Sequence, residues 1–219
     1  MKILCISDTT ESPAFSDSLK KIFSDTDMVI SCGDIPEQSY DYITTTLGKE
    51  IFYVFGNHNY RDWKKSHGIQ INSPYYGNII EDRCIRTKQG LLIAGLGGSM
   101  KYNKGLCQYT EEQMAARIRK LKLRLIYNKI RYGRYLDILV THAPVYGLDD
   151  CEDLCHRGFK CFADFINKYK PKYIVHGHCH LESRDQNRIS LLNSTKVINT
   201  FGCYLLEDDF EPTGKGGNS

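Results

Sequence analysis

The stretch Tyr173 to His180 reads YIVHGHCH, and the rest of the chain is interpreted outward from it. The segment up to His176 is mostly apolar and β-branched and follows Pro171, which predicts a short buried strand. A glycine then lets the chain turn sharply, and two histidines follow one residue apart. Because residues i and i+2 of an extended segment point the same way, His178 and His180 can reach one metal ion. A polar loop is the alternative interpretation.

The composition is that of an ordinary globular protein. The 219 residues are 41% hydrophobic and 25% charged, which suits one well-filled domain over residues 1–207. A net charge of +3 does not favour nucleic acid, and no apolar run approaches the length of a membrane span. The first apolar run is too short for a signal peptide, and nine cysteines are an odd number, so we expect reduced thiols in a cytoplasmic protein. Residues 208–219 are polar and glycine-rich and are expected to form a disordered tail.

Strands and helices are expected to alternate along the first third of the chain. Apolar strands over 2–7, 28–31 and 51–55 are separated by helices that begin near Ser12 and Pro36. This order predicts an α/β fold with a parallel sheet. Further strands and one helix are expected over 79–80, 84–87, 91–94, 136–141, 159–169 (the helix), 195–199 and 201–207.

A long helix is expected to begin at the capping box of Thr110 and Gln113 and to end at Gly133. Its basic residues are Arg117, Arg119, Lys120, Lys122, Arg124, Lys129 and Arg131. We expect them to form a solvated face, while the core side is formed by Ile118, Leu121, Leu125 and Ile126. A patch for a polyanion is the alternative interpretation.

Polar side chains follow five of the apolar strands. In chain order they are Asp8; Asp34; Asn57 and His58; His142; and His178 and His180. In open α/β sheets, ligands bind outside the carboxyl ends of the strands. Each motif is weak by itself, but the ordered set predicts one site at one sheet edge.

This ordered set resembles the calcineurin-like metallophosphoesterase superfamily, whose pattern is D-x-H, G-D, G-N-H followed by an acid, a lone His, and G-H-x-H. The corresponding segments of this chain are Asp8-Thr9-Thr10, Gly33-Asp34, Gly56-Asn57-His58-Asn59, His142 and Gly177-His178-Cys179-His180. The likeness spans nearly the whole chain and implies a four-layer α/β/β/α sandwich.

The resemblance also implies roles at two divalent metal ions. The first ion would be held by Asp8, Asp34 and His180, and the second by Asp34, Asn57, His142 and His178. His58 would contact the phosphate and protonate the leaving oxygen. Two such ions clamp the attacking and leaving oxygens and make a bridging water more acidic. Mixed nitrogen and oxygen ligands suit Mn, Fe, Zn or Ni, so the identity of the metal stays open.

Two residues depart from the family pattern. Thr10 replaces a histidine, and because a hydroxyl is a poor ligand beside an imidazole, we expect a weakened first ion site, completed by water or Glu11, and one or two ions in total. Asn59 replaces an acid, which predicts a less basic His58 and a lower pH optimum. Asn59 and Arg157 are candidate contacts of a substrate phosphate.

Four zinc-type residues lie close together in the sequence: Cys151, Cys155, His156 and Cys161. Their spacing matches no standard zinc pattern, so a structural zinc is the less favoured interpretation.

The sequence therefore predicts a metal-dependent phosphoesterase that hydrolyses a phosphodiester, with small or cyclic nucleotides as candidate substrates and no membrane partner. A phosphomonoesterase, including a phosphoprotein phosphatase, and a nuclease are alternatives within the same chemistry. A non-catalytic scaffold with a partly lost metal site is the alternative from another class. Thr10 favours the scaffold, whereas the retained His58 opposes it. The oligomeric state is not indicated by the sequence.

Overall fold

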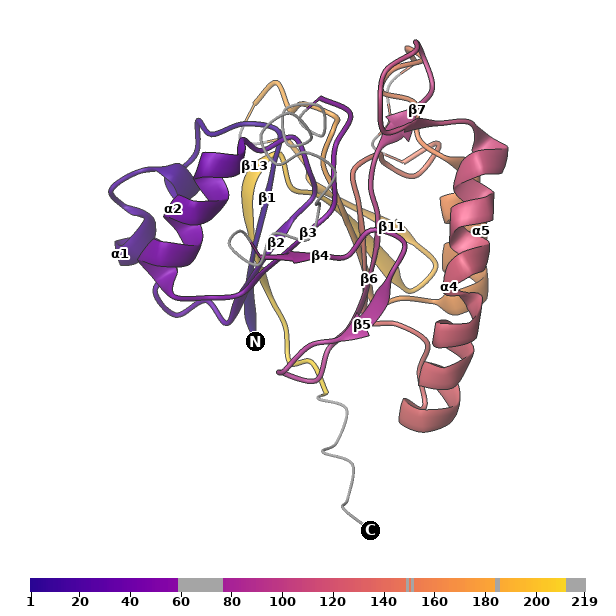
Figure 1. Cartoon of the computed structure of the whole chain (residues 1–219), viewed down its shortest axis with the longest axis horizontal. Coiled ribbons are helices and arrows are strands. Elements are labelled where there is room, and N and C mark those ends of the chain that lie inside the picture. The colour runs from indigo at the N-terminus through magenta and orange to yellow at the C-terminus, as the bar shows by residue number, and fades with distance from the viewer. Residues whose placement is uncertain (59–76, 149, 151, 184–185, 212–219) are drawn as a thin grey trace.

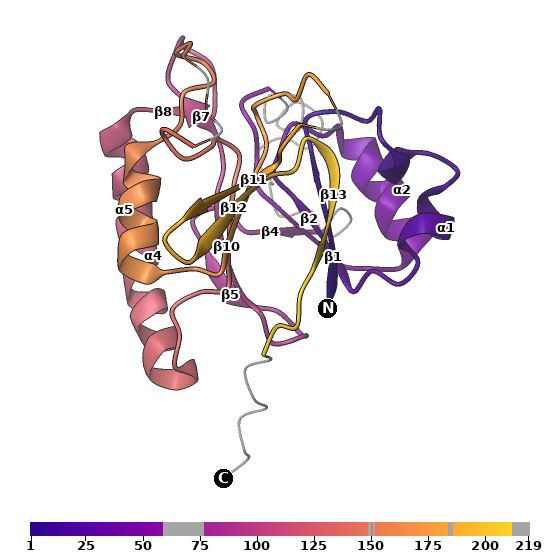
Figure 2. The ribbon, with the colours of Figure 1, turned by 180° about the vertical axis from the view of Figure 1, so that it is seen from behind.

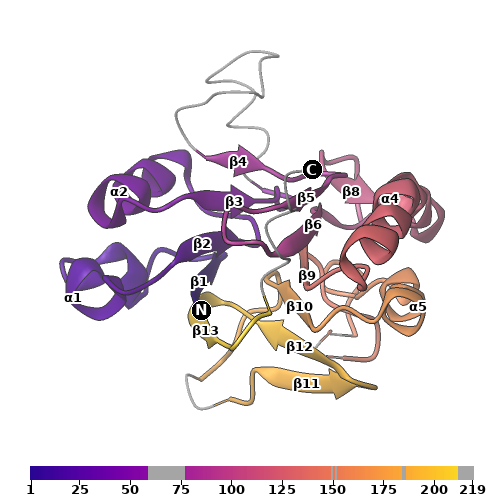
Figure 3. The same cartoon turned by 90° about the horizontal axis from the view of Figure 1, so that it is seen from below.

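The computed structural model describes residues 1–58, 77–148, 150, 152–183 and 186–211 (Figure 1). Two β-sheets pack face to face, and helices cover the outer face of each sheet (Figure 3). Helices α1 and α2 lie on one outside, and α4 and α5 lie on the other. This is the expected four-layer α/β/β/α sandwich. Each sheet has helices on one face only, because its other face packs against the second sheet.

The first sheet has the strand order β13-β1-β2-β3-β4. Its strands are β1 (Lys2–Ser7), β2 (Met28–Ser31), β3 (Ile51–Tyr53), β4 (Asn78–Ile79) and β13 (Gly202–Glu207). Strands β1 to β4 are parallel, and β13 pairs antiparallel with β1. Its helices are η1 (Pro13–Phe15), α1 (Leu19–Phe23) and α2 (Glu37–Leu47).

The helix expected after Ser12 is interrupted. A 3-10 turn, η1, ends at Ser16, whose backbone is extended, and α1 begins three residues later. The Ser16 hydroxyl donates to the carbonyl of Pro13 and accepts from the N–H of Ser18. Such local bonds between serine side chains and the backbone compete with helical ones. In the shortened helix, Ile22 is 48% exposed.

The second sheet has the order β11-β12-β10-β9-β6-β5 (Figure 3), and Figure 2 shows its strands β10, β11 and β12. Its strands are β5 (Cys84–Arg86), β6 (Leu92–Leu96), β9 (Ile138–Thr141), β10 (Tyr173–His176), β11 (Ile189–Leu192) and β12 (Thr195–Asn199). Strands β6, β9, β10 and β12 are parallel. Strand β11 was not predicted. Its apolar residues Ile189 and Leu191 face solvent, so the strand lacks the usual alternation of buried apolar and exposed polar residues. The short pair β7 (Ser99–Met100) and β8 (Gln108–Tyr109) also lacks a sequence pattern.

Helix α4 (Glu111–Tyr132) begins and ends where the sequence predicts. Thr110 and Gln113 exchange both bonds of the capping box, and Gly133 ends the helix in the left-handed conformation. The expectation that Arg117 belongs to the solvated face is wrong, because two acids of the β4–β5 turn hold its guanidinium inside. Ile126 was expected in the core but is 38% exposed. Helix α5 covers Lys160–Tyr169.

The core has three layers of apolar side chains, one between the sheets and one under each pair of helices. Phe210 packs into the central layer, although the sequence places it in a polar tail. The N-terminal amine of Met1 donates to the carbonyl of Asp208, and Lys172 forms an ion pair with the same residue, so this segment lies against the sandwich. Residues 212–219 lie outside the described part of the chain. Within that part, the cysteines are free thiols, and no helix has the length and apolar character needed to cross a membrane.

Candidate metal centre

Three of the residues that follow the parallel strands have an unusual backbone conformation. Asp8, Asp34 and His178 each have a left-handed backbone, with φ values of 66°, 55° and 69°. Non-glycine residues rarely adopt this conformation, and such strain is concentrated at functional sites. The three residues follow β1, β2 and β10, so the strain marks the carboxyl edges of both sheets.

His142 lies at the middle of this edge and is fully buried. Its Nδ1 donates to the carbonyl of Cys32 at 2.8 Å, because a carbonyl oxygen can only accept. Its Nε2 therefore faces the Oδ1 of Asn57 at 2.9 Å and the Oδ2 of Asp34 at 3.2 Å. Three lone-pair atoms that converge in this way need a cation between them, either a proton or a metal ion. A backbone carbonyl that holds the far ring nitrogen is the usual support of a metal-binding histidine.

The electrostatics of the pair agree with this geometry. Burial lowers the pKa of His142, but the carboxylate of Asp34 more than offsets that effect and raises the pKa to about 9. Burial raises the pKa of Asp34, but the His142 imidazolium outweighs it and holds the pKa well below its usual range. Without a metal ion, a proton on His142 therefore occupies the position that a cation can take.

His178 completes the group. The ligand atoms of Asp34, His142 and His178 all lie within 4.8 Å of one another. The Nε2 of His178 donates to the carbonyl of Cys155 at 2.7 Å, which leaves Nδ1 as the nitrogen with a lone pair. Burial and repulsion from His142 lower the pKa of His178 to about 3, so its ring is neutral, as a metal ligand must be.

The remaining residues expected at the first ion are less closely gathered. The backbone N–H of His178 donates to both oxygens of Asp8, and burial raises the pKa of the Asp8 carboxyl. His180 is exposed, and its ring packs on Phe201 at a centroid distance of 4.7 Å. Thr10 is exposed. Neither group of potential ligands found in the described part of the chain includes Asp8 or His180.

Two glycines make this close packing feasible. A Cβ atom on Gly56 would lie 2.0 Å from Oδ1 of Asp34, and one on Gly177 would lie 2.5 Å from Oδ2 of Asp8. Such separations are far below van der Waals contact, so any side chain at either position would displace a carboxylate of the centre.

The residues expected to contact substrate lie around the rim. The backbone N–H of His58 donates to Oδ1 of Asp34 at 3.0 Å, and His58 itself is exposed. The guanidinium of Arg157 is exposed and donates to the carbonyl of Glu152 at 3.3 Å. Asn59 lies outside the described residues, as does the segment 61–76.

Tyr102 is a site residue without a sequence signal. Its hydroxyl accepts from Nδ2 of Asn57 at 3.2 Å, which fixes the amide so that its oxygen faces His142. Tyr102 lies between β7 and β8, whose fold back over the sheet edge is a tertiary feature that no local motif encodes.

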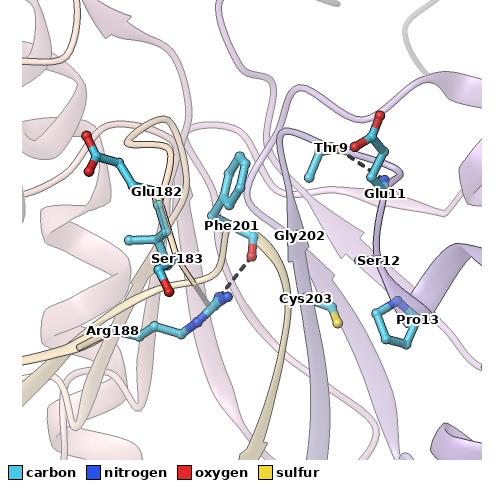
Figure 4. A pocket seen from close by; sticks show the side chains of 11 residues that line it. Thr9, Glu11, Ser12, Pro13, Glu182, Ser183, Arg188, Phe201, Gly202 and Cys203 are labelled. Carbon is cyan, nitrogen blue, oxygen red and sulfur yellow. Dashed lines mark hydrogen bonds between the residues drawn. The ribbon is translucent and has the colours of Figure 1, made fainter. Parts of the chain in front are cut away.

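A pocket of about 340 Å³ opens beside the centre (Figure 4). It is lined by Thr9, which follows Asp8, and by Leu181, which follows His180. Phe201 forms an aromatic wall, and Arg188 donates to the Phe201 carbonyl at 2.8 Å. The pocket therefore combines an apolar surface with the guanidinium of Arg188 and the carboxylates of Glu11 and Glu182, next to the candidate metal ligands.

Comparison with known proteins gives a family and a fold. The family model of the calcineurin-like phosphoesterases matches residues 1–182. The crystal structure of TT1561 of Thermus thermophilus is 16% identical, with a TM-score of 0.58 over 92% of this chain and 89% of that chain. GAP50, the anchor in the inner membrane complex of Plasmodium, is 12% identical, with a TM-score of 0.54 over 91% of this chain and 70% of that chain. These structures are similar in fold alone. No curated protein sequence matches the chain.

Proposed function

Because the chain belongs to the calcineurin-like phosphoesterase family, we propose that it is a metal-dependent hydrolase of phosphodiesters that acts at the centre around His142. The observation that carries this proposal is the convergence of Asp34 Oδ2 and Asn57 Oδ1 on Nε2 of His142. In the metal-free protein a proton on Nε2 of His142 joins these atoms, and a divalent ion can take the place of that proton.

The donor chemistry fits a divalent ion. Two imidazoles, a carboxylate and an amide oxygen form the kind of mixed set that binds Mn, Fe, Zn or Ni. We assign one ion to Asp34, Asn57, His142 and His178. The first ion of the family pattern, which we expect to bind more weakly, is assigned to Asp8, Asp34 and His180, with Thr10 in place of the family histidine. A bound divalent ion supplies Lewis-acid polarisation of the phosphate and a more acidic water at neutral pH.

Two side chains of the protein then orient the metal ligands and protonate the leaving group. The amide of Asn57 is held by Tyr102, so its oxygen does not need to reorganise when an ion binds. His58 is fastened through its backbone to Asp34 and lies on the exposed side, where substrate arrives. In hydrolysis, the water oxygen forms a bond to phosphorus and the bond to the leaving alcohol oxygen breaks. We assign to the imidazole of His58 the proton that this leaving oxygen takes up.

The pocket of Figure 4 favours a diester over a monoester. A phosphodiester carries an organic group on each side of phosphorus, and the pocket gives one of them an aromatic wall at Phe201 and a cation at Arg188. A small nucleotide matches these features, because a base can stack on an aromatic ring and a guanidinium can bind an anionic group.

A non-catalytic scaffold is the second candidate, and one observation favours it. His180 packs on Phe201 and is exposed, and Thr10 offers no imidazole, so the first ion has few strong ligands. A scaffold would bind metal weakly or not at all and would not hydrolyse phosphate esters.

The deciding experiment is the hydrolysis of bis(p-nitrophenyl) phosphate by metal-stripped protein during titration with manganese. We expect saturable turnover that Asp34→Ala abolishes and that the exposed control Asp164→Ala, on α5, retains. Comparison with p-nitrophenyl phosphate separates diester from monoester hydrolysis. Folded protein that shows no turnover with Mn, Fe, Zn or Ni would overturn the proposal in favour of the scaffold.

A further inference from the structure

A second set of metal-binding atoms meets at His178. The Sγ of Cys155, a ring nitrogen of His156 and a ring nitrogen of His178 all lie within 4.8 Å of one another. The rings of His156 and His178 are tilted against each other at a centroid distance of 4.8 Å. Two of these residues come from the loop that precedes α5, and the third follows β10. Their convergence is therefore produced by the fold and not by neighbourhood in the sequence.

His156 is oriented as a metal ligand. Its Nδ1 lies 3.0 Å from both carboxylate oxygens of Asp153, and its backbone N–H donates to the same side chain. Because a carboxylate holds the Nδ1 proton, Nε2 carries the lone pair that can bind an ion. A carboxylate behind a histidine is the common support of zinc-binding imidazoles, since it fixes the tautomer and raises ligand basicity.

Cys155 is tied to both neighbouring groups. Its carbonyl accepts from Nε2 of His178, which directs Nδ1 of that ring as the ligand atom. Its side chain lies near the hydroxyl of Tyr102, which also holds the amide of Asn57. The thiol is half-buried and pairs with no other cysteine among the described residues. It is thus held next to the metal centre without a disulfide or a core role to account for it.

We propose that Cys155, His156 and His178 form a zinc site with one thiolate and two imidazole ligands, adjoining the phosphoesterase centre. Three protein ligands leave a fourth position for water or another ligand, as in zinc sites that are open to chemistry. A thiolate selects zinc over manganese and magnesium, which prefer oxygen ligands. The site shares His178 with the proposed phosphoesterase centre, but it is defined by ligation alone and does not require that reaction.

The cluster of zinc-type residues in the sequence, from Cys151 to Cys161, indicated a different set of ligands. Cys161 lies in α5, where its backbone N–H donates to Glu111 at 2.6 Å, and it is not in the group at His178. Cys151 lies outside the described residues. The partner of Cys155 and His156 is a residue more than twenty positions further on, which explains why no standard zinc spacing appears.

The two ligand sets exclude each other at His178. One imidazole nitrogen binds one ion, and the other nitrogen of this ring is used by the Cys155 carbonyl. An ion held by Cys155 and His156 therefore takes His178 away from Asp34 and His142. Zinc in the thiolate site would weaken the binding of the ion that Asp34, His142 and His178 hold at the phosphoesterase centre.

Cobalt is the probe, because a thiolate ligand gives cobalt(II) a charge-transfer band in the near ultraviolet that oxygen and nitrogen ligands do not give. We expect metal-stripped protein to develop this band on titration with cobalt and to lose it when zinc is added. Cys155→Ser should abolish the band, whereas Cys203→Ser, a half-buried thiol of the Figure 4 pocket, should retain it. Asp153→Asn should weaken zinc binding by about tenfold, as loss of an outer carboxylate commonly does.

A wild-type protein that binds no cobalt, or binds it without the band, overturns the zinc site. A band that persists in Cys155→Ser overturns it as well. These results are independent of the phosphoesterase proposal, because manganese-dependent turnover that Asp34→Ala abolishes would stand without any thiolate band, and the band would stand without turnover.

Discussion

The backbone N–H of His178 donates to both carboxylate oxygens of Asp8, at 3.0 and 2.9 Å. The two residues are 170 positions apart in the sequence and follow β10 and β1, which belong to different sheets. The bond therefore crosses the interface of the sandwich at its carboxyl edge. Asp8 therefore stabilises the fold in addition to any role as a metal ligand. Measurements on metal-free protein separate the two roles.

Replacement of Asp8 by alanine should destabilise the metal-free protein. The N–H of His178 would be left without its acceptor in a buried place, which costs about 1–3 kcal/mol. Asp8→Asn keeps one oxygen acceptor and should lose less than Asp8→Ala. Denaturant titration of metal-stripped variants measures the difference without a contribution from bound ions. Equal loss in both variants would mean that the charge of Asp8, and not its hydrogen bond, stabilises the fold.

Gly56→Ala should disable the centre while the fold survives. The new Cβ would lie 2.0 Å from Oδ1 of Asp34 and would push that carboxylate away from His142. A displacement of about 1 Å at a reacting centre can cost about a hundredfold in rate, so turnover of bis(p-nitrophenyl) phosphate should fall by about that factor. Gly133→Ala is the control, because it strains a left-handed glycine far from the site with nothing within 4 Å. If both variants keep their turnover, Asp34 is not at the reacting centre.

Local sequence patterns predicted the strands that lead to this edge. Each of the strands β1, β2, β9 and β10 is signalled by an apolar run, and the polar residue that follows it stands where the parallel strands bring it. The capping box of Thr110 predicted the start of α4 because both of its bonds are local. Features that depend on residues within about four positions of one another were therefore readable.

Features that depend on distant partners were not readable. The burial of Arg117 requires Glu81 and Asp82, which lie more than thirty positions away. The packing of Phe210 between the sheets requires β13 to lead the chain back to Tyr173. The meeting of Cys155 with His178 likewise depends on the path of the loop before α5. Composition and spacing contain no record of these tertiary contacts.

The Arg117 side chain, 8% exposed, should be essential for stability. It forms ion pairs with Glu81 and Asp82 and donates to the carbonyl of Gly97, while Glu81 accepts the N–H of Phe55 just before the Gly56 turn. Loss of one partner from such a buried network costs about 3–5 kcal/mol, which we expect for Arg117→Leu in denaturant titration. Lys120→Ala is the matched control.

Lys120 also pairs with Asp82, but it is 63% exposed, so its loss should cost less than about 1 kcal/mol. A result in which the two substitutions cost the same would show that burial adds nothing to the Arg117 ion pairs.

The same network should make stability depend on acid. Burial raises the pKa of Asp82, but Arg117 and Lys120 outweigh it and lower the pKa below its usual value. A carboxyl whose pKa is lowered by folding stabilises the protein above its unfolded pKa, about 3.9, and loses that contribution as the pH falls through its folded pKa. The urea midpoint of the wild type should therefore fall more steeply below about pH 4 than that of Asp82→Asn. If the urea midpoints of the two proteins fall in parallel with pH, Asp82 does not contribute to the loss of stability in acid.

Thr10→His should strengthen the weaker ion site. Thr10 is exposed beside the Asp8 turn, and the family pattern has a histidine at this place, so an imidazole there would join Asp8, Asp34 and His180 as a ligand. We expect manganese titration of the stripped variant to show a second ion that binds about tenfold more tightly than in the wild type, a gain of about 1.4 kcal/mol. Thr9→His is the matched control, because it adds the same imidazole at the neighbouring position, which lines the pocket of Figure 4. If Thr10→His binds manganese no better than the wild type, the missing histidine is not what weakens the site, and the distance of His180 from the ligand cluster becomes the cause to test.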